Sequence, residues 1–478
     1  MSRDAAASLA GGWHGLFSEG RTGSTFMLCL GVALYAFNDF VVITTMPTAV
    51  VELGAPALIS LSFSIFLVAA IVGGSVGGLM KQRFGARSAL LLTAGLIACG
   101  SLMTSVAVSM EMVLAGRIFT GFGEGVVAAI CYALIPEFYP PSLVAKVFGA
   151  EAVVWALAAF LGPLLGGILT EVISWRVAFL VNVPLIIIFA VFVIQKVKPE
   201  SGAERVTERV PLGRLMMVTA SILAVSFAGT TTETWIIIPL LAFAFLGLFA
   251  TFSADRSKDV RLFPKGAFVL GAPLGAIFWV ALLMPIGQAT VSVYIALMMQ
   301  HVFGYDPSEA GFVAAILALS WSGTAIVVAT VVREHLALTM VRLGPLVMAL
   351  GLVATSFGIW TGLAGWVFLG QVFVGGGFGL NWAFLSHHVM TVAAPGERDL
   401  ASGLLPTVQS AGYALGAALA GLTAAVYGLG DSVAAVDLKG AAVWIFGIGS
   451  VMGLAAFAIS FSISALPAAD GRSGSTQV

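Results

Sequence analysis

Fourteen apolar runs, each long enough to cross a lipid bilayer, make up most of this 478-residue chain. A spanning helix needs about 20 predominantly apolar residues. Inside the hydrocarbon core, only helices and closed barrels pair all of their backbone polar groups. The runs cover residues 26–50, 58–80, 89–110, 112–134, 147–170, 175–194, 212–229, 235–252, 268–298, 310–332, 338–360, 365–390, 400–429 and 441–466. The sequence therefore predicts an all-α polytopic membrane protein with fourteen transmembrane helices.

Composition agrees with this class and argues against several others. Only 9% of the residues are charged, whereas a soluble domain contains roughly 25%. The net charge of −1 gives no reason to expect a nucleic-acid partner. The three cysteines, Cys29, Cys99 and Cys131, lie inside apolar runs, so we expect neither a disulfide nor a metal site. The sequence contains no HExxH motif, Gly-rich phosphate loop or His/Cys cluster, so we expect no enzyme activity and no cofactor.

Lysine and arginine are concentrated in the loops on one side of the predicted bundle. With the N-terminus in the cytoplasm, the cytoplasmic side receives all 22 Lys and Arg residues except Arg117, Arg176 and Lys439. The loops on the other side carry Asp and Glu instead. Cytoplasmic loops are enriched in Lys and Arg in membrane proteins, so both termini are predicted to be cytoplasmic.

Two of the runs are similar to each other. Residues 114–129 (LAGRIFTGFGEGVVAA) align with residues 368–383 (FLGQVFVGGGFGLNWA), so that Arg117 corresponds to Gln371, an offset of 254 residues. Duplicated halves are usual in secondary transporters. Six helices would give a shorter offset, and the excess of about 60 residues is the length of a two-helix hairpin.

The repeat predicts how the chain is divided. We expect two pseudo-symmetric six-helix bundles and an inserted hairpin, joined by cytoplasmic segments. The predicted parts are an N-terminal segment (1–25), the first bundle (26–194), a linker (195–211), the hairpin (212–252), a second linker (253–267), the second bundle (268–466) and a disordered tail (467–478).

Three charged residues lie deep in the predicted spans. Asp39 is near the middle of the first span, and Glu124 is near the middle of the fourth. Arg117 lies two helical turns, about 10 Å, from Glu124 on nearly the same helix face. Charged residues are costly in a bilayer and indicate function, and an isolated carboxyl group there binds a proton more readily than in water. We expect these three residues to couple proton movement to transport; the alternative is a static Asp39–Arg117 pair with Glu124 facing water.

Other residues are candidates for packing, for a cavity, or for the membrane surface. Small residues with one proline follow the fifth run, where they allow close helix approach and a bend: Gly149, Ala158, Gly162, Pro163, Gly166 and Gly167. Polar and aromatic candidates for a substrate cavity are Tyr35, Trp155, Gln288, Tyr294, Trp321, Asn381 and Trp382. Glu151 begins the fifth span, and we expect it to be a solvated charge at a helix end.

Several motifs resemble those of the major facilitator superfamily, and within it the fourteen-helix drug:proton antiporters. The stretch GLMKQRFGARSAL (78–90) is similar to the loop signature between helices 2 and 3, and it has Gln82 where that signature has an acidic residue. The matching positions of this loop are Gly78, Arg83, Gly85 and Arg87. The fifth-run pattern is similar to the signature that distinguishes exporters from uptake systems. The stretch NDFVVITTMP resembles the helix 1 signature, which implies Asp39 as its acid, and LAGRIFTGFGEG resembles the helix 4 signature, whose arginine, here Arg117, is linked to proton transfer.

The resemblance implies a proton-coupled antiporter that exports a small amphipathic or cationic compound by alternating access. Its energy source would be the proton gradient, and its location the bacterial cytoplasmic membrane, as a monomer in contact with lipid. The alternative is a proton-coupled uptake symporter on the same fold. A membrane receptor that transports nothing is a third reading.

Overall fold

The computed structural model is all-helical wherever it describes the chain, and contains no strand there. The described residues are 13–18, 20–199, 211–255, 262–328, 334–393, 397–429 and 437–463. The helices are η1 (Trp13–Leu16), α2 (Thr22–Glu52), η2 (Pro56–Leu58), α3 (Ile59–Phe84), α4 (Ala86–Ser105), α5 (Met110–Phe138), α6 (Pro141–Val172), α7 (Trp175–Leu180), α8 (Asn182–Lys196), α9 (Leu212–Ala228), α10 (Thr234–Asp255), α11 (Pro273–Phe303), α12 (Pro307–Val328), α13 (Glu334–Thr361), α14 (Ala364–Val392), α15 (Arg398–Val426) and α16 (Leu438–Ser460).

The helix count agrees with the sequence prediction. Helices α7 and α8 form one apolar span, Trp175–Lys196, so α2 to α16 amount to fourteen crossing units in the described chain. Large apolar side chains cover the outside of the bundle; Phe245 and Ile326, for example, are each 71% exposed. Such a surface needs lipid rather than water around it. The protein is therefore a multi-pass membrane protein.

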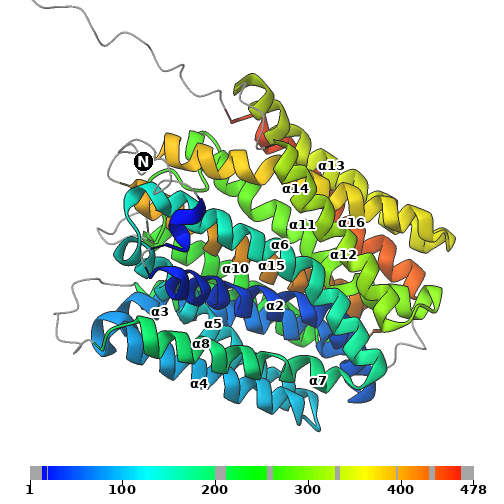
Figure 1. Cartoon of the computed structure of the whole chain (residues 1–478). Coiled ribbons are helices and arrows are strands. Elements are labelled where there is room, and N and C mark those ends of the chain that lie inside the picture. The colour runs from blue at the N-terminus through cyan, green and yellow to red at the C-terminus, as the bar shows by residue number, and fades with distance from the viewer. Residues whose placement is uncertain are drawn as a thin grey trace, which may run out of the picture.

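The two halves of the chain lie beside each other (Figure 1). Helices α2, α3, α4, α5 and α8 occupy the lower part of the view, and α13, α14 and α16 the upper part. We call the end of the bundle where α2 begins the basic end, because Arg21, Lys81 and Lys196 lie there. The opposite end is called the acidic end, after Glu52 and Glu171.

The largest apolar core joins the two halves toward the acidic end. Its first-half members come from the acidic-end parts of their helices and loops: Val42, Ile43, Met46, Ala49, Val50, Ile59, Phe63, Ala107, Met110, Val113, Trp175 and Phe179. A second core at the basic end contains first-half residues alone, among them Leu28, Leu90 and Cys131. Among the described residues, apolar packing between the halves is thus concentrated at the acidic end.

Polar contacts between the halves follow the same distribution. Ser64 Oγ donates to the Ala414 carbonyl over 3.1 Å. Ser308 donates to the Glu171 carboxylate through its hydroxyl and through its backbone N–H, the latter over 3.4 Å. A Cβ atom at Gly311 would collide with the Pro163 carbonyl. Helices α6 and α12 therefore approach backbone to backbone near the acidic end, as small residues allow.

The hairpin of α9 and α10 covers the line where α3 meets α15. Ile222 of α9 packs in one apolar cluster with Phe66 of α3 and Ala414 of α15. At the basic end of the hairpin, Arg214 and Asp255 form an ion pair that joins its two helices. Asp255 also accepts from the backbone N–H groups of residues 262 and 263, over 2.8 and 3.0 Å, and so fixes the chain that leads to the second half.

Several predicted spans differ from the structure at their ends or centre. The run 268–298 becomes helical only at Pro273, because Phe268 has a φ of 60° and its carbonyl accepts from Trp279 Nε1 over 2.9 Å. The run 175–194 is interrupted at Val181, and the run 441–466 ends as helix at Ser460. The predicted tail lies outside the described residues, as do parts of the predicted N-terminal segment and linkers.

Candidate functional site

Arg117 and Glu124 of α5 are connected through a third residue, Asn38 of α2. The Asn38 side-chain nitrogen donates to Glu124 Oε1 over 2.8 Å. The Asn38 oxygen accepts from Arg117 Nη1 over 3.2 Å. A neutral amide therefore links a cation and an acid that lie seven residues apart on one helix. Asn38 was not predicted as a site residue, although it precedes Asp39 inside an apolar run and its polarity was a usable signal.

All three side chains of this network are buried, and each is 1% exposed. Glu124 Oε2 and Arg117 Nη2 are buried without a hydrogen-bond partner among the described residues. Burying a charge without full pairing is unfavourable. The second oxygen of Glu124 is thus the position in this network where a proton can be bound without breaking a hydrogen bond.

Helix α3 fixes the guanidinium group of Arg117. Arg117 Nε donates to the Ser62 carbonyl over 3.3 Å, and the guanidinium carbon lies 3.9 Å from the centre of the Phe66 ring. An aromatic face attracts a cation, more strongly where water is excluded. The cation is therefore held in place by α3 and Asn38, and Glu124 lies at the far end of this chain of contacts.

Asp39 lies apart from this network. Its side chain is partly buried, and in the described part of the chain its carboxylate has no hydrogen bond or ion pair. The static Asp39–Arg117 pair considered from the sequence is therefore not formed, although the two residues are within electrostatic range. Asp39 is also within electrostatic range of Tyr35 and of Tyr413 on α15. It thus lies where α2 faces the second half.

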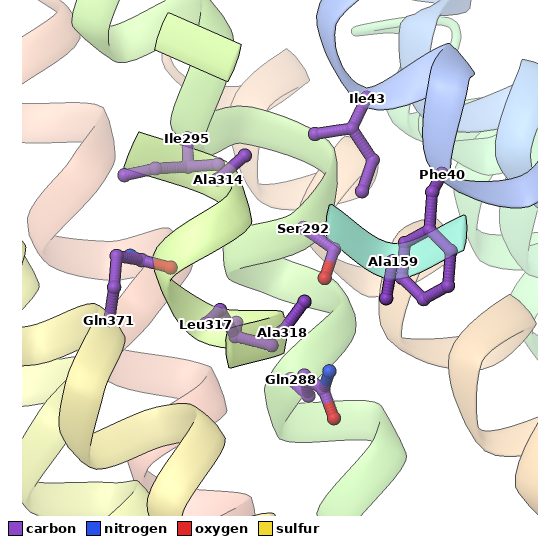
Figure 2. A pocket seen from close by; sticks show the side chains of 10 residues that line it. All are labelled: Phe40, Ile43, Ala159, Gln288, Ser292, Ile295, Ala314, Leu317, Ala318 and Gln371. Carbon is purple, nitrogen blue, oxygen red and sulfur yellow. The ribbon is translucent and has the colours of Figure 1, made fainter. Parts of the chain in front are cut away.

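A small cavity lies between the halves, and Phe40, the residue that follows Asp39, is part of its lining. It is lined by Phe40, Ile43, Ala159, Gln288, Ser292, Ile295, Ala314, Leu317, Ala318 and Gln371. Figure 2 shows Gln288 on α11 and Gln371 on α14, with Leu317 and Ala318 of α12 between them. The cavity volume is about 20 Å³, which is room for a water molecule. A drug-sized ligand needs about 300–1,000 Å³, so this cavity is too small to hold one.

Two glutamines supply polar groups to the cavity. Gln371, the repeat counterpart of Arg117, is 0% exposed, and both of its amide atoms lack a partner among the described residues. Gln288 Oε1 accepts from the Tyr413 hydroxyl over 2.9 Å. Tyr413 therefore connects the surroundings of Asp39 with the cavity. Gln371 and Tyr413 were not predicted as site residues, because nothing in the sequence shows that α14 and α15 meet α11 here.

The structure places the other cavity candidates in different surroundings. The rings of Tyr35 and Trp155 are 5.8 Å apart and extend an aromatic layer from Phe40, which lines the cavity. Tyr294 lies in the large apolar core, outside the cavity lining. Asn381 is also outside the lining, and its side-chain nitrogen donates to the Val341 carbonyl over 2.6 Å.

The repeat position of Glu124 in the second half is occupied by an aromatic cluster. Phe378 lies 4.7 Å from the Trp321 ring and 5.4 Å from the Trp382 ring, measured between centroids. Trp321 and Trp382 therefore pack around Phe378, and neither lines the cavity. The same fold position thus carries a buried charge network in one half and apolar ring packing in the other.

The small-residue pattern of α6 lies against α2 and α12. A Cβ at Gly162 would lie 2.6 Å from Phe40 Cβ, and one at Gly166 would lie 2.7 Å from Thr44 Oγ1. Thr44 Oγ1 donates to the Pro163 carbonyl over 3.0 Å. A Cβ at Gly167 would collide with the α12 backbone. Of the two remaining positions, Ala158 is buried beside α2 and Gly149 faces the Trp13 ring.

The loop motif forms the turn between α3 and α4 at the basic end. Gly85 lies between the two helices with a φ of 77°, a backbone conformation that residues other than glycine rarely adopt. Lys81 forms an ion pair with Glu137 of α5. Gln82 Oε1 is buried without a partner among the described residues. Of the other predicted positions, Gly78 and Arg87 are partly buried and Arg83 is exposed.

Glu151 differs from its predicted surroundings. It lies on the eleventh residue of α6, is 2% exposed, and neither carboxylate oxygen has a hydrogen-bond partner in the described chain. The expectation of a solvated helix-end charge is therefore wrong. In the part of the chain that the structure describes, no group of three or more His, Cys, Asp or Glu residues is arranged to hold a metal ion.

Comparison with known proteins identifies relatives over most of the chain. The profile of the Major Facilitator Superfamily matches residues 28–393. A "probable multidrug-efflux transporter" of Mycobacterium tuberculosis is 30% identical over 429 residues, which cover 87% of this chain and 90% of the relative. "Multidrug efflux pump SdrM" of Staphylococcus aureus is 24% identical, covering 62% of this chain and 66% of the relative.

Solved structures of transporters share the fold. A peptide transporter in complex with alafosfalin has a TM-score of 0.68 and 18% identity, and the match covers 94% of this chain and 95% of that one. A D-xylose-proton symporter has a TM-score of 0.64 and 16% identity, covering 93% and 98% of the two chains.

Proposed function

The chain belongs to the major facilitator superfamily of membrane transporters, and we propose that it is a proton-driven antiporter that exports a small amphipathic or cationic compound. Asp39 and Glu124 would bind the protons, and Arg117 would adjust the charge balance of Glu124. The carrying observation is the Arg117–Asn38–Glu124 network, in which one buried oxygen of Glu124 has no hydrogen-bond partner among the described residues.

In this proposal, the two ends of the bundle face opposite sides of the membrane. The basic end would face the cytoplasm, in keeping with the distribution of Lys and Arg, and both termini would be cytoplasmic. The halves pack against each other at the acidic end, so the structure would correspond to a state closed toward the outside. Its location would be a bacterial cytoplasmic membrane, with the chain acting as a monomer and without a cofactor.

Each step of the cycle follows from this arrangement. When the halves part at the acidic end, protons from outside would bind Asp39 and Glu124, and the exported compound would leave. Return to the closed acidic end would carry the protons toward the cytoplasm. Each proton that crosses the full membrane potential supplies about 2.3 kcal/mol per 100 mV, which is the energy source that the proposal requires.

Two features favour export over uptake by a symporter. The relatives named above are described as efflux transporters. The α6 glycines are packed against α2 and α12 near the acidic end, and this is the pattern that resembles the signature of exporters. The cavity lining includes no carboxylate, so a cationic compound would meet the charge of Asp39 only at the edge of the cavity.

The test measures accumulation of ethidium and tetraphenylphosphonium in inverted membrane vesicles with an acidic lumen. Wild type should accumulate these cations, whereas Asp39→Asn and Glu124→Gln should each lower accumulation by at least about tenfold, because neither amide binds a proton. Glu111→Gln is the matched control, since Glu111 is an exposed acid in the first turn of the same helix as Glu124. Accumulation only in right-side-out vesicles would identify a symporter, and full activity of both variants would refute the proton assignment.

A further inference from the structure

A second buried acid lies outside the site described above. Glu151 of α6 is 2% exposed, and both of its carboxylate oxygens are buried without a hydrogen-bond partner among the described residues. No Lys, Arg or His forms an ion pair with it in the described chain. An isolated buried carboxylate is unfavourable, so such a group takes up a proton or a cation. Neither the Arg117 network nor the cavity makes use of this residue.

Titratable groups surround Glu151 from two neighbouring helices, and none of them is basic. Those within electrostatic range are Cys29 of α2, Cys131 and Tyr132 of α5, and Tyr139 at the end of α5. Thiol and phenol groups stay neutral near pH 7 unless they are activated. Among these described groups Glu151 is therefore the one carboxylic acid, and no basic group is paired with it to hold it ionised.

Its depth places Glu151 between the central site and the basic end. Cys131 follows Glu124 by seven residues on α5, which is about 10 Å along the axis toward the basic end. Cys29 precedes Asp39 by ten residues on α2, about 15 Å in the same direction. Because Glu151 is in electrostatic range of both cysteines, it lies on the basic-end side of both predicted proton carriers.

A hydroxyl pair continues from this cluster toward the basic end. The Tyr139 and Thr25 hydroxyls share a hydrogen bond of 2.7 Å. Thr25 Oγ1 also lies 2.7 Å from the carbonyl of Leu16, to which it donates. Leu16 belongs to the short helix η1 at the start of the described chain. Buried polar groups thus lie on the basic-end side of Glu151, as far as the short helix η1.

We propose that Glu151 is a further proton-binding position, through which protons pass from Glu124 toward the basic end. The inference rests on the proposed proton coupling. In the transfer, the Glu124 carboxylic acid loses its proton and becomes a carboxylate, while the Glu151 carboxylate gains one. Glu151 then releases that proton to water at the basic end, and only O–H bonds form or break. No hydrogen bond joins Glu124 and Glu151 in the described chain, so water must enter between the two acids for the transfer.

The test compares two readouts in liposomes that contain the purified protein. One is tetraphenylphosphonium accumulation driven by a pH gradient, and the other is exchange of labelled for unlabelled tetraphenylphosphonium without a gradient. Glu151→Gln keeps the size of a protonated glutamate but binds no proton. It should lower the driven accumulation by about tenfold or more and leave exchange at the wild-type rate. Glu151→Asp should restore most of the driven accumulation, and Glu111→Gln should change neither readout.

The outcomes separate this inference from the proposed function. Wild-type driven accumulation in Glu151→Gln would overturn the inference, because a merely structural, protonated glutamate tolerates that substitution. Equal loss of exchange and driven accumulation would overturn it as well, since that pattern indicates general damage. A wild-type protein that ignores the pH gradient would instead refute the proposed function. If Glu151→Gln does not fold, dicyclohexylcarbodiimide labelling of the wild-type protein decides: pH-dependent modification of Glu151, found by mass spectrometry, supports the inference, and no modification at any pH overturns it.

Discussion

Asn38 of α2 donates a hydrogen bond to Glu124 of α5 over 2.8 Å. Helix α2 contributes residues to the cavity between the halves, whereas α5 contributes none to its lining. Three consecutive residues of α2 lie near different parts of the protein. Asn38 points to Glu124 and Arg117, Asp39 lies near Tyr413 of the second half, and Phe40 lines the cavity. A shift of α2 would therefore change the surroundings of the proton-binding acids and of the cavity at the same time.

The first prediction concerns Asn38. Asn38→Ala removes the partners of Glu124 Oε1 and Arg117 Nη1, and a buried polar group without a partner costs about 1–3 kcal/mol. We expect a lower melting temperature in detergent and a decrease in pH-driven accumulation that exceeds the decrease in exchange. Asn381→Ala is the control, because Asn381 is an equally buried amide bonded to the Val341 carbonyl in the second half. If both variants lose the two transport readouts in equal proportion, Asn38 has no special part in coupling.

The second prediction concerns Gln371. Its amide lies buried beside the cavity and has no partner in the part of the chain that the structure describes, so Gln371→Leu should leave the melting temperature unchanged or raise it. If the amide instead bonds a transported compound, its loss should weaken apparent affinity by about tenfold, the equivalent of one hydrogen bond. The measurement is the concentration of ethidium that gives half-maximal transport. Gln300→Leu removes another amide, whose nitrogen is buried without a partner among the described residues and which does not line the cavity. An equal change in both variants would count against a binding role for Gln371.

The third prediction concerns the close approach of α6 and α12. A side chain at Gly167 would meet the backbone of Pro307 and Ser308, so Gly167→Val should keep the acidic end from closing. The readout is disulfide cross-linking between Glu171→Cys and Ser308→Cys, two positions that are hydrogen-bonded in the structure. We expect less cross-linking and loss of transport in Gly167→Val. Gly95→Val is the control, because a Cβ at Gly95 meets no atom of the described residues within 4 Å. Unchanged cross-linking would show that this approach does not control closure.

Most of the helices could be predicted, because a bilayer demands long apolar runs and the runs are separated by charged or Gly- and Pro-containing loops. The break at Val181 was missed, although Pro184 in the first turn of α8 was a usable signal, because proline has no N–H to bond to the carbonyl of residue 180. The late start of α11 was also missed, because residues 268–272 are as apolar as a membrane-spanning helix but form turns around Phe268.

The charged residues of the candidate site could be found from the sequence, but their partners could not. A charge inside an apolar run is visible without a structure, which is how Asp39, Arg117 and Glu124 were found. The bridge through Asn38 depends on how α2 is rotated against α5, which no local pattern specifies. Glu151 was misplaced because its helix was predicted to begin at residue 147. The helix begins at Pro141, and the ten residues before Glu151 put it about 15 Å along the helix axis.

The hairpin of α9 and α10 has a mechanical consequence for any motion between the halves. Ile222 packs with α3 from the first half and α15 from the second in one apolar cluster, so α9 cannot travel rigidly with both. One of its two faces must slip whenever the halves rotate. The contact between these two helices includes Ala224 of α9 and Ala418 of α15, whose short side chains offer little resistance to such slippage. The pair of helices would then slide along α15 and still keep lipid acyl chains out of the interface between the halves while the halves move.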